Sequence, residues 1–423
     1  MSQKVAKKAE SKCADKPIIA IIGLGFVGLP LALAFGKYYR TIGFDLDKRR
    51  VQALKAYKDS TQEFSKQDFL RAKKVHFTYR LEEIDEANFY IIAVPTPVTN
   101  DKKPDLSYLL QASQMVGKHL KKGDIIIYES TTYPTCTRKD CVPMLEAASG
   151  LKYNQDFFVG YSPERINPAD KAHRLEHIKK ITSGSTKESA HKIDKLYKRI
   201  ITAGTHCVSS IEVAEASKAL ENAQRDINIA FMNEMYILLD KLGIDMAEVL
   251  EAARTKWNFL PFYPGLVGGH CIGIDPYYLY HIAQSVGYHT RIIASGRVIN
   301  ETMPRVFAHK LLKLLANAKI EIVGSRVLVV GFAFKADCTD IRNTKVPKLC
   351  EELESFGARV DVVDSMVDTR KTLQYYGRKI MRPKMLQKDS YDALLVLVCH
   401  SKDKAIDFRG FLKEKGVFLA INA

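Results

Sequence analysis

Three glycines near the N-terminus have the spacing of a phosphate-binding turn. The motif Gly23-x-Gly25-x-x-Gly28 follows an apolar run and precedes a helical one, and Asp45 comes twenty residues after Gly25. Glycines let the backbone approach a pyrophosphate at a helix N-terminus, while the acid binds the adenosine ribose hydroxyls. The motif therefore predicts dinucleotide binding. Asp45 favours NAD over NADP, because a 2′-phosphate would meet a like charge, although one of the basic residues at 48–50 could pair with that phosphate.

A cysteine surrounded by glycines forms a second centre. Residues 265–275 read GLVGGHCIGID, with Cys271 four residues before Asp275. The glycines leave the sulfur accessible, and the carboxylate could handle a proton or fix a water. A thiol beside NAD can oxidise an aldehyde through a thioester, whereas the alternative is a buried thiol in a turn. His270 either activates the thiol or packs the loop.

Polar residues at helical spacing form a third centre. Glu215, Lys218, Asn222 and Arg225 recur every three or four residues and so share one helix face. From periodicity alone, we expect this face to be a solvated row of charges. The loop at 162–168, SPERINP, is a further candidate because it follows a strand end, where ligands of open α/β sheets bind.

These centres need parallel sheets to position them. Continuous apolar runs predict strands at 18–23, 40–45, 89–94, 124–130 and 157–163, and again at 325–334, 358–364 and 391–400. Between these two sets, residues 210–242 keep helical spacing without proline, as in a helix that joins domains or forms a dimer seam. The prediction is an α/β fold with two Rossmann-like doubly wound domains joined by a long central helix and a helical segment.

The expected domain organisation follows from these runs. We assign a disordered leader to 1–16, an NAD-binding Rossmann domain to 17–207, a central helical dimerisation and substrate domain to 208–320, and a C-terminal Rossmann-like domain to 321–423. Residues 17–36 are uncharged but contain four glycines and two prolines. They therefore predict a strand, turn and helix, and no membrane span.

The charge balance narrows the choice of partners. Among 423 residues, 64 Lys and Arg exceed 48 Asp and Glu, which gives a formal charge of +16. The excess is scattered without a five-residue basic run, so we expect small anionic substrates and no nucleic acid. Eight cysteines without a C-x-x-C pair indicate a reducing cytoplasm, and no metal site is expected.

The combined motifs resemble the UDP-glucose/GDP-mannose dehydrogenase family from residue 17 onward. The matching segments are GLGFVGLPLA (23–32), PTP (95–97), ESTTYP (129–134), SPERINP (162–168), EASKALENAQRDINIAFMNE (215–234), GLVGGHCIGIDPYYL (265–279) and GFAFKADCTDIRN (331–343). SPERINP, KWNFLPF (256–262) and the cysteine segment are most similar to the branch that oxidises UDP-N-acetylhexosamines, UDP-GlcNAc or UDP-GalNAc, to uronic acids. The resemblance implies NAD, a UDP-sugar substrate, a role in surface polysaccharide synthesis and a homodimer.

The resemblance also implies residue roles. Cys271 is the expected nucleophile, Lys218 and Asn222 the oxyanion stabilisers, and Asp275, Glu164 and Thr131 the groups that handle protons and water. The expected cofactor contacts are Gly23, Gly25, Phe26, Val27, Gly28, Asp45, Arg50, Thr96, Thr131 and Arg342. The expected substrate contacts are Glu164, Arg165, Lys218, Asn222, Arg254, Gly268 and Lys335.

Two departures and several rivals stay open. Ala169 stands where the family has glycine, and the chain stops at Ala423, soon after its last strand. Within the enzyme class, the rivals are oxidation of UDP-glucose, UDP-ManNAc or GDP-mannose, and a single oxidation of the β-hydroxyacid dehydrogenase type. From another class, the rival is a non-catalytic nucleotide- or polyanion-binding protein.

Overall fold

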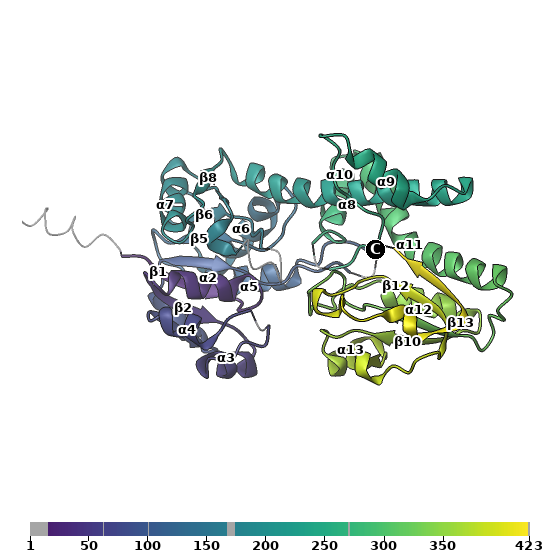
Figure 1. The fold of residues 1–423 in the computed structure, drawn as a ribbon. Coiled ribbons are helices and arrows are strands. Elements are labelled where there is room, and N and C mark those ends of the chain that lie inside the picture. The colour runs from purple at the N-terminus through teal and green to yellow at the C-terminus, as the bar shows by residue number, and fades with distance from the viewer. Residues whose placement is uncertain (1–15, 62, 100, 167–173, 270, 422–423) are drawn as a thin grey trace, which may run out of the picture. The chain divides into compact units, whose positions relative to one another are not determined.

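The computed structural model describes residues 16–61, 63–99, 101–166, 174–269 and 271–421. The chain forms two compact units, Met1–Leu220 with Tyr277–Ile282, and Glu221–Pro276 with Ala283–Ala423 (Figure 1). Each unit is built on one large parallel sheet with helices, which confirms the predicted α/β class. The predicted leader lies outside the described residues except for Lys16, and the predicted domain boundaries stay predictions.

The first unit has a six-stranded parallel sheet in the order β3-β2-β1-β4-β5-β6. The strands are β1 (Ile18–Ile22), β2 (Arg40–Phe44), β3 (Val75–Thr78), β4 (Phe89–Ile92), β5 (Ile125–Tyr128) and β6 (Phe158–Tyr161). All five predicted strands are confirmed. The sequence analysis missed β3, because this short edge strand buries only Phe77 and Thr78. It also missed the small parallel pair β7 (Lys180–Thr182) and β8 (Thr205–Cys207).

Helices complete the first unit. They are α2 (Gly28–Phe35), α3 (Lys48–Lys55), α4 (Lys66–Arg71), α5 (Ser107–Gly117), α6 (Val142–Ser149) and α7 (Lys187–Lys198). All eight residues of α2 are buried, and its apolar side chains join those of β1 and β4 in one core. This burial against the sheet explains why residues 17–36 are apolar. In the described part of the chain, no helix is long and apolar enough to cross a bilayer.

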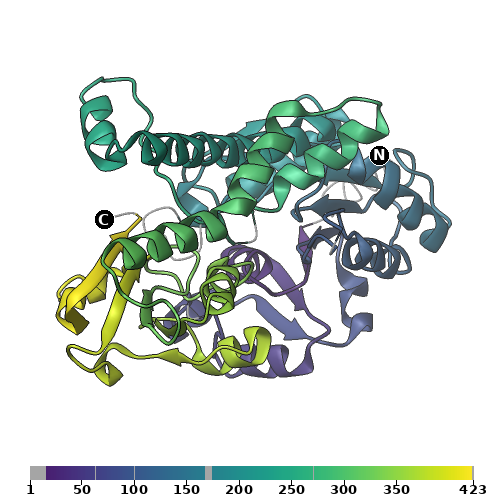
Figure 2. The ribbon, with the colours of Figure 1, turned by 90° about the vertical axis from the view of Figure 1, so that its right-hand side faces the viewer.

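The predicted long helix is α8 (Ile211–Leu242), which has 32 residues and supplies residues to both units. It is followed by α9 (Met246–Arg254), α10 (Asp275–Ser285) and α11 (Arg291–Asn317). Figure 2 shows α8 and α11 as the longest helices. Helices of this length can carry functional groups on one face while burying another, which matters for the row that begins at Glu215.

The second unit repeats the topology of the first with fewer strands. Its parallel sheet has the order β11-β10-β9-β12-β13, so β9 is flanked by β10 and β12 as β1 is flanked by β2 and β4. The elements are β9 (Arg326–Val330), β10 (Arg359–Val363), β11 (Ile380–Met381), β12 (Tyr391–Val396), β13 (Leu412–Ala420), α12 (Val346–Ser355) and α13 (Thr369–Tyr376). The three runs predicted as strands here, at 325–334, 358–364 and 391–400, are confirmed, and α11 and α12 pack on this sheet.

Candidate functional site

The glycine turn has the shape that a dinucleotide needs. Gly23 adopts a φ of +90°, which glycine tolerates, and a Cβ on Gly28 would lie 1.8 Å from the Gly23 carbonyl oxygen. By contrast, a Cβ on exposed Gly25 would meet nothing within 4 Å. Phe26 and Val27 are half-buried between this turn and α2. The turn therefore leaves room for a pyrophosphate at the N-terminus of α2.

Asp45 organises the same turn. One carboxylate oxygen accepts a hydrogen bond from the Leu24 N–H at 2.8 Å, and the other accepts from the Asp47 N–H at 2.9 Å. The half-buried carboxylate lies just after β2, where an adenosine ribose is bound in this fold. The position suits the predicted cofactor contact.

Arg50 has a partner that the sequence did not indicate. Its Nη1 donates to Asp59 Oδ1 at 2.9 Å and to Ser60 Oγ at 2.8 Å, while Nε donates to the Leu24 carbonyl at 3.1 Å. Burial opposes ionisation of Asp59, but hydrogen bonds from Thr61 and Arg50 outweigh it and lower the pKa of this carboxyl. Arg50 therefore braces the glycine turn through Nε and Nη1, and its predicted contact with the cofactor stays a prediction.

A loop after β5 is held by one buried carboxylate, Glu215. Its oxygens accept hydrogen bonds from the N–H groups of Thr135 at 2.6 Å and Thr137 at 2.9 Å, and from the hydroxyls of Thr132 and Thr137. Burial raises the pKa of Glu215 to about 7, although these hydrogen bonds act in the opposite direction. Thr135 adopts a φ of +85°, which is unusual for a β-branched residue. Glu215 thus fixes the loop that begins at half-buried Thr131.

Thr96, another predicted cofactor contact, lies shortly after β4. Thr96 is buried, and its carbonyl accepts a hydrogen bond from the Tyr278 hydroxyl at 3.0 Å. Tyr278 is itself fully buried, so the bond ties the PTP turn to the part of α10 that belongs to the first unit, Tyr277–Ile282.

Glu164 belongs to a buried charge cluster. Its Oε2 accepts a hydrogen bond from Lys180 Nζ at 2.8 Å, and the same nitrogen donates to Glu129 Oε2 at 2.6 Å. The side chains of Lys180 and Glu129 are almost completely buried. Neighbouring Arg165 is half-buried and donates from Nη1 to the Lys179 carbonyl at 2.9 Å.

The polar face of α8 is mostly buried, so the expectation of a solvated row of charges is wrong. Glu215, Lys218 and Asn222 are buried, and only Arg225 is exposed. Periodicity identifies residues that share a face but does not tell whether that face meets solvent. Lys218 makes no hydrogen bond or ion pair with any described residue, so its ammonium is available to an anion.

Asn222 and Asp275 come together beside the cysteine. Asn222 Nδ2 donates to Asp275 Oδ2 at 2.5 Å, and both side chains are buried in the second unit. Half-buried Cys271 begins the turn into α10, and its carbonyl accepts the Asp275 N–H at 2.9 Å. The positive end of a helix dipole favours an anion at this position. His270 lies outside the described residues, as do residues 167–170 at the end of the SPERINP loop.

The glycines around Cys271 pack closely against other segments. A Cβ on Gly268 would lie 2.7 Å from Phe334 Cβ, and the Gly269 N–H donates to the Arg342 carbonyl at 3.1 Å. The half-buried Arg342 guanidinium forms a forked pair with Asp340, at 2.7 to 3.0 Å. These contacts fix the cysteine loop against the loop that follows β9.

Asn233 on α8 holds the start of the cysteine loop. Its Oδ1 accepts the Gly265 N–H at 2.7 Å, and its Nδ2 donates to the Gly265 carbonyl at 3.0 Å. The same amide donates to Asn300 on α11 at 2.8 Å. A fully buried side chain therefore replaces the backbone partners that this loop lacks.

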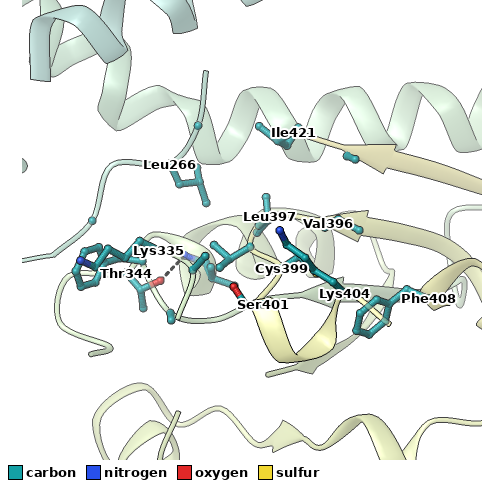
Figure 3. A pocket seen from close by; sticks show the side chains of 18 of the residues that line it. Leu266, Lys335, Thr344, Val396, Leu397, Cys399, Ser401, Lys404, Phe408 and Ile421 are labelled. Atoms are coloured by element: carbon teal, nitrogen blue, oxygen red, sulfur yellow. Dashed lines mark hydrogen bonds between the residues drawn. The ribbon is translucent and has the colours of Figure 1, made fainter. Parts of the chain in front are cut away.

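A cavity of about 900 Å³ opens beside the cysteine loop in the second unit. Gly265, Leu266 and Gly268 line one side, and Figure 3 shows Lys335 and Lys404 among the side chains around it. Arg409 adds a further cation to the lining, whereas the ammonium of Lys345 there is already paired with Glu301 at 2.6 Å. The volume is that of a small-molecule site, and the cations suit a ligand with phosphate groups.

Arg254 stands apart from these groups. It is exposed at the end of α9, and its guanidinium lies 4.2 Å from the centre of the Tyr263 ring.

The predicted site residues are divided between the two units. The glycine turn, Asp45, Thr96, Thr131, Glu164 and Lys218 belong to the first unit, whereas Asn222, Gly268, Cys271, Asp275, Lys335 and Arg342 belong to the second.

Comparison with known proteins decides the family. The sequence matches three domains of the UDP-glucose/GDP-mannose dehydrogenase family: the NAD binding domain over residues 18–201, the central domain over 212–302 and the UDP binding domain over 328–420. The chain belongs to this family. A UDP-N-acetyl-D-glucosamine 6-dehydrogenase of Salmonella typhi is 50% identical over 406 residues, covering 95% of each chain. Another, of Pseudomonas aeruginosa, is 50% identical over 386 residues, covering 91% of each chain.

Solved structures agree with this assignment. A UDP-D-ManNAc dehydrogenase from Pyrococcus horikoshii is 28% identical and has a TM-score of 0.85, with 95% of this chain and 98% of that chain covered. An NDP-N-acetyl-D-galactosaminuronic acid dehydrogenase from Methanosarcina mazei Go1 is 25% identical, with a TM-score of 0.81 and coverage of 98% and 97%.

The family places the two ligand-binding features in known domains. The glycine turn and Asp45 lie within the NAD binding domain, and most of the cavity lining, including Lys335 and Lys404, lies within the UDP binding domain. The chain is therefore an NAD-dependent nucleotide-sugar dehydrogenase.

Sequence reasoning missed the buried residues that hold Glu164 and the cysteine loop in place. Glu129 stands at the end of β5, within the ESTTYP segment, and this place at a strand end was a usable signal. Lys180 and Asn233 carried no such signal, because their partners are 16 and 32 residues away.

Proposed function

We propose that the substrate is a UDP-N-acetylhexosamine, UDP-GlcNAc or UDP-GalNAc, and that its C6 hydroxymethyl group is oxidised to a carboxylate. Identity of 50% to two UDP-N-acetyl-D-glucosamine 6-dehydrogenases supports this substrate class. The cation-lined cavity next to the cysteine loop supports a nucleotide diphosphate. UDP-glucose and UDP-ManNAc are the alternative substrates.

The observation that carries the proposal is the arrangement of Cys271, Asn222 and Asp275 at the N-terminus of α10. Oxidation of an alcohol to an acid removes four electrons, and two NAD molecules bound in turn would each accept one hydride. The aldehyde must be retained between the steps. Attack of the Cys271 sulfur on the aldehyde carbon holds it as a thiohemiacetal, whose oxidation leaves a thioester.

Five other side chains would serve the charges that form during this chemistry. The buried Lys218 ammonium and the Asn222 amide, one turn apart on α8, would stabilise the oxyanion that develops at each tetrahedral stage. Asp275 orients the Asn222 amide through the 2.5 Å bond. Glu164, together with Thr131, would orient the water that hydrolyses the thioester and accept its proton.

A substrate panel tests this function. Incubation with NAD and UDP-GlcNAc, UDP-GalNAc, UDP-ManNAc, UDP-glucose or GDP-mannose should give two NADH for each sugar consumed, fastest with a UDP-N-acetylhexosamine. A ratio of one would indicate a single oxidation of the β-hydroxyacid dehydrogenase type. Absence of turnover with every sugar would support a non-catalytic binding protein.

The covalent step has its own test. The substitution Cys271→Ser should abolish uronate formation, whereas Cys207→Ser at an exposed cysteine should leave the rate unchanged. Uronate formation by Cys271→Ser at the normal rate would rule out the thioester route.

A homodimer is supported by the apolar surface of α8. Phe231, Leu238 and Leu242 follow one another at intervals of seven and four residues, so they share a face, and each is about half exposed. A second copy of the chain would cover them. Leu238→Glu should shift the protein to a monomer in light scattering after size exclusion, whereas Lys241→Glu at a polar position of the same helix should not.

The cellular setting is also a proposal. All seven described cysteines are free thiols, which suits a reducing cytoplasm, where nucleotide sugars would be converted to precursors of surface polysaccharide. Accumulation of the corresponding uronate in cells that express the enzyme, and its loss with Cys271→Ser, would test this role.

A further inference from the structure

Glu164 is bonded to a buried lysine, Lys180, which has no role in the chemistry proposed above. Lys180 on β7 has a side chain only 2% exposed, and its Nζ donates to Glu164 Oε2, to Glu129 Oε2 and to the Pro163 carbonyl, at 2.8, 2.6 and 3.0 Å. Its three donors are therefore all used within the protein. A lysine bound in this way is not available to substrate, so any role in catalysis must pass through its partners.

Glu164 is held by three donors. Its Oε1 accepts the N–H groups of Arg165 at 2.6 Å and Ile166 at 2.8 Å, and Lys180 takes one position on Oε2. Each carboxylate oxygen offers about two acceptor positions. The three bonds thus fix the plane of the carboxylate, and the described residues leave one acceptor position on Oε2 for a water.

Glu129 completes the cluster. It accepts hydrogen bonds from Lys180 and from the Tyr197 hydroxyl on α7. Burial raises the pKa of Glu129 to about 7, and Lys180 acts in the opposite direction. The lysine is the single cation bonded to these two buried carboxylates among the described residues. If it were removed, two neighbouring carboxylates would remain buried without compensation, and one would take up a proton.

We propose that Lys180 is a positioning residue that holds Glu164 as an oriented carboxylate for thioester hydrolysis. This inference rests on the proposed role of Glu164. In that step the water oxygen bonds to the acyl carbon, the carbon–sulfur bond breaks, the Cys271 thiolate leaves, and Glu164 takes a proton from the water. If Glu164 is protonated or rotated, it cannot accept this proton. Sugar binding and the two oxidations do not require Glu164 to accept a proton.

The test separates hydrolysis from oxidation. Each enzyme is mixed with excess NAD and with the UDP-sugar that the wild type turns over fastest, and the initial burst of NADH is compared with the steady rate. The acyl adduct on Cys271 is followed by mass spectrometry of the intact protein. Both Glu164→Gln and Lys180→Met should show a burst, a steady rate lower by about 10- to 100-fold, and an accumulated adduct.

A double-mutant cycle tells whether Lys180 acts through Glu164. If it does, adding Lys180→Met to Glu164→Gln should slow hydrolysis by less than about threefold beyond the single variant. Lys180→Arg, which keeps the cation, should recover part of the rate. The matched control Lys198→Met removes an exposed lysine of α7 and should behave as wild type.

Several results would overturn the inference. These are additive effects in the double variant, normal hydrolysis in Lys180→Met, or a slow Lys180→Met beside a normal Glu164→Gln. If Lys180→Met does not fold, Glu129→Gln decides the matter. This variant keeps the cation on Glu164 and should hydrolyse at nearly the wild-type rate, so a defect as deep as that of Glu164→Gln would mean that the cluster serves folding alone. Failure of the proposed function would differ from all of these, because the wild type would not form two NADH per sugar.

Discussion

Two alanine substitutions in the glycine turn should separate folding from NAD binding. In Gly28→Ala, the new Cβ would lie 1.8 Å from the Gly23 carbonyl oxygen and 3.2 Å from Ile21 Cγ2. In Gly25→Ala, the new Cβ would meet no protein atom within 4 Å and would instead occupy the space beside the N-terminus of α2. The first change therefore acts on the protein itself, and the second acts on the ligand.

The expected magnitudes follow from these distances. A real Cβ essentially never comes within 3.0 Å of another heavy atom, so Gly28→Ala must displace backbone, and overpacking of this kind costs about 1–3 kcal/mol. For a unit of this size, each kcal/mol lowers the melting temperature by about 2–4 °C. NAD at about 100 times its Kd stabilises the wild type by roughly 2.7 kcal/mol, and Gly25→Ala should lose most of this gain.

Thermal melting with and without NAD, together with calorimetric titration of NAD, measures both effects. Gly25→Ala should melt as the wild type does without NAD, should bind NAD at least tenfold more weakly, and should show little stabilisation by it. Gly28→Ala should melt several degrees lower even without NAD. Wild-type NAD affinity in Gly25→Ala, or wild-type melting of Gly28→Ala without NAD, would refute this account of the turn.

Two further predictions concern buried polar groups. In Asn233→Asp, a carboxylate oxygen would face the Gly265 carbonyl in place of an N–H donor. An unpaired buried acceptor costs about 1–3 kcal/mol, so kcat and the melting temperature should both fall. The control Asn228→Asp on the same helix should change neither. The raised pKa of Glu215, about 7 against 4.5, means that the folded state holds this proton more tightly than the unfolded chain. The stability from this group is thus fully present below about pH 4.5 and is lost, by about 3 kcal/mol, as the pH rises to 7. Glu215→Gln should remove this part of the pH dependence in denaturant titrations, and an unchanged slope would contradict the assigned cause.

Much of the fold could be predicted because its signals are local. Continuous apolar runs indicate buried parallel strands, and unbroken helical spacing over residues 210–242 indicated α8. The strands that were missed are short. β3 buries two of its four residues, and β7 is only three residues long and contains a lysine and a threonine, so their sequences resemble loops. The glycine turn was predictable for a related reason, since a tight turn and a close approach of backbone to ligand leave glycine as the one residue that fits.

The candidate site was harder to predict from the sequence, because the role of a charged residue depends on the residues that surround it. The row on α8 looked like a solvated face, yet Lys218 and Asn222 are buried and Glu215 holds a loop some eighty residues away. Likewise, nothing near Arg50 in the sequence indicated that its side chain would bond to Asp59 and to the Leu24 carbonyl. Periodicity records which residues share a face, but it does not record which other segment covers that face.

The amino-acid sequence by itself determined the α/β class, the dinucleotide turn and the cysteine centre, because each depends on residues close together in the chain. Tertiary structure alone decided that Lys180 joins Glu129 to Glu164, from 51 and 16 residues away, and that Asn233 holds Gly265. The physical reason is desolvation. A buried charge or amide must find a partner inside the protein, and only the packing of distant segments determines which partner is within reach.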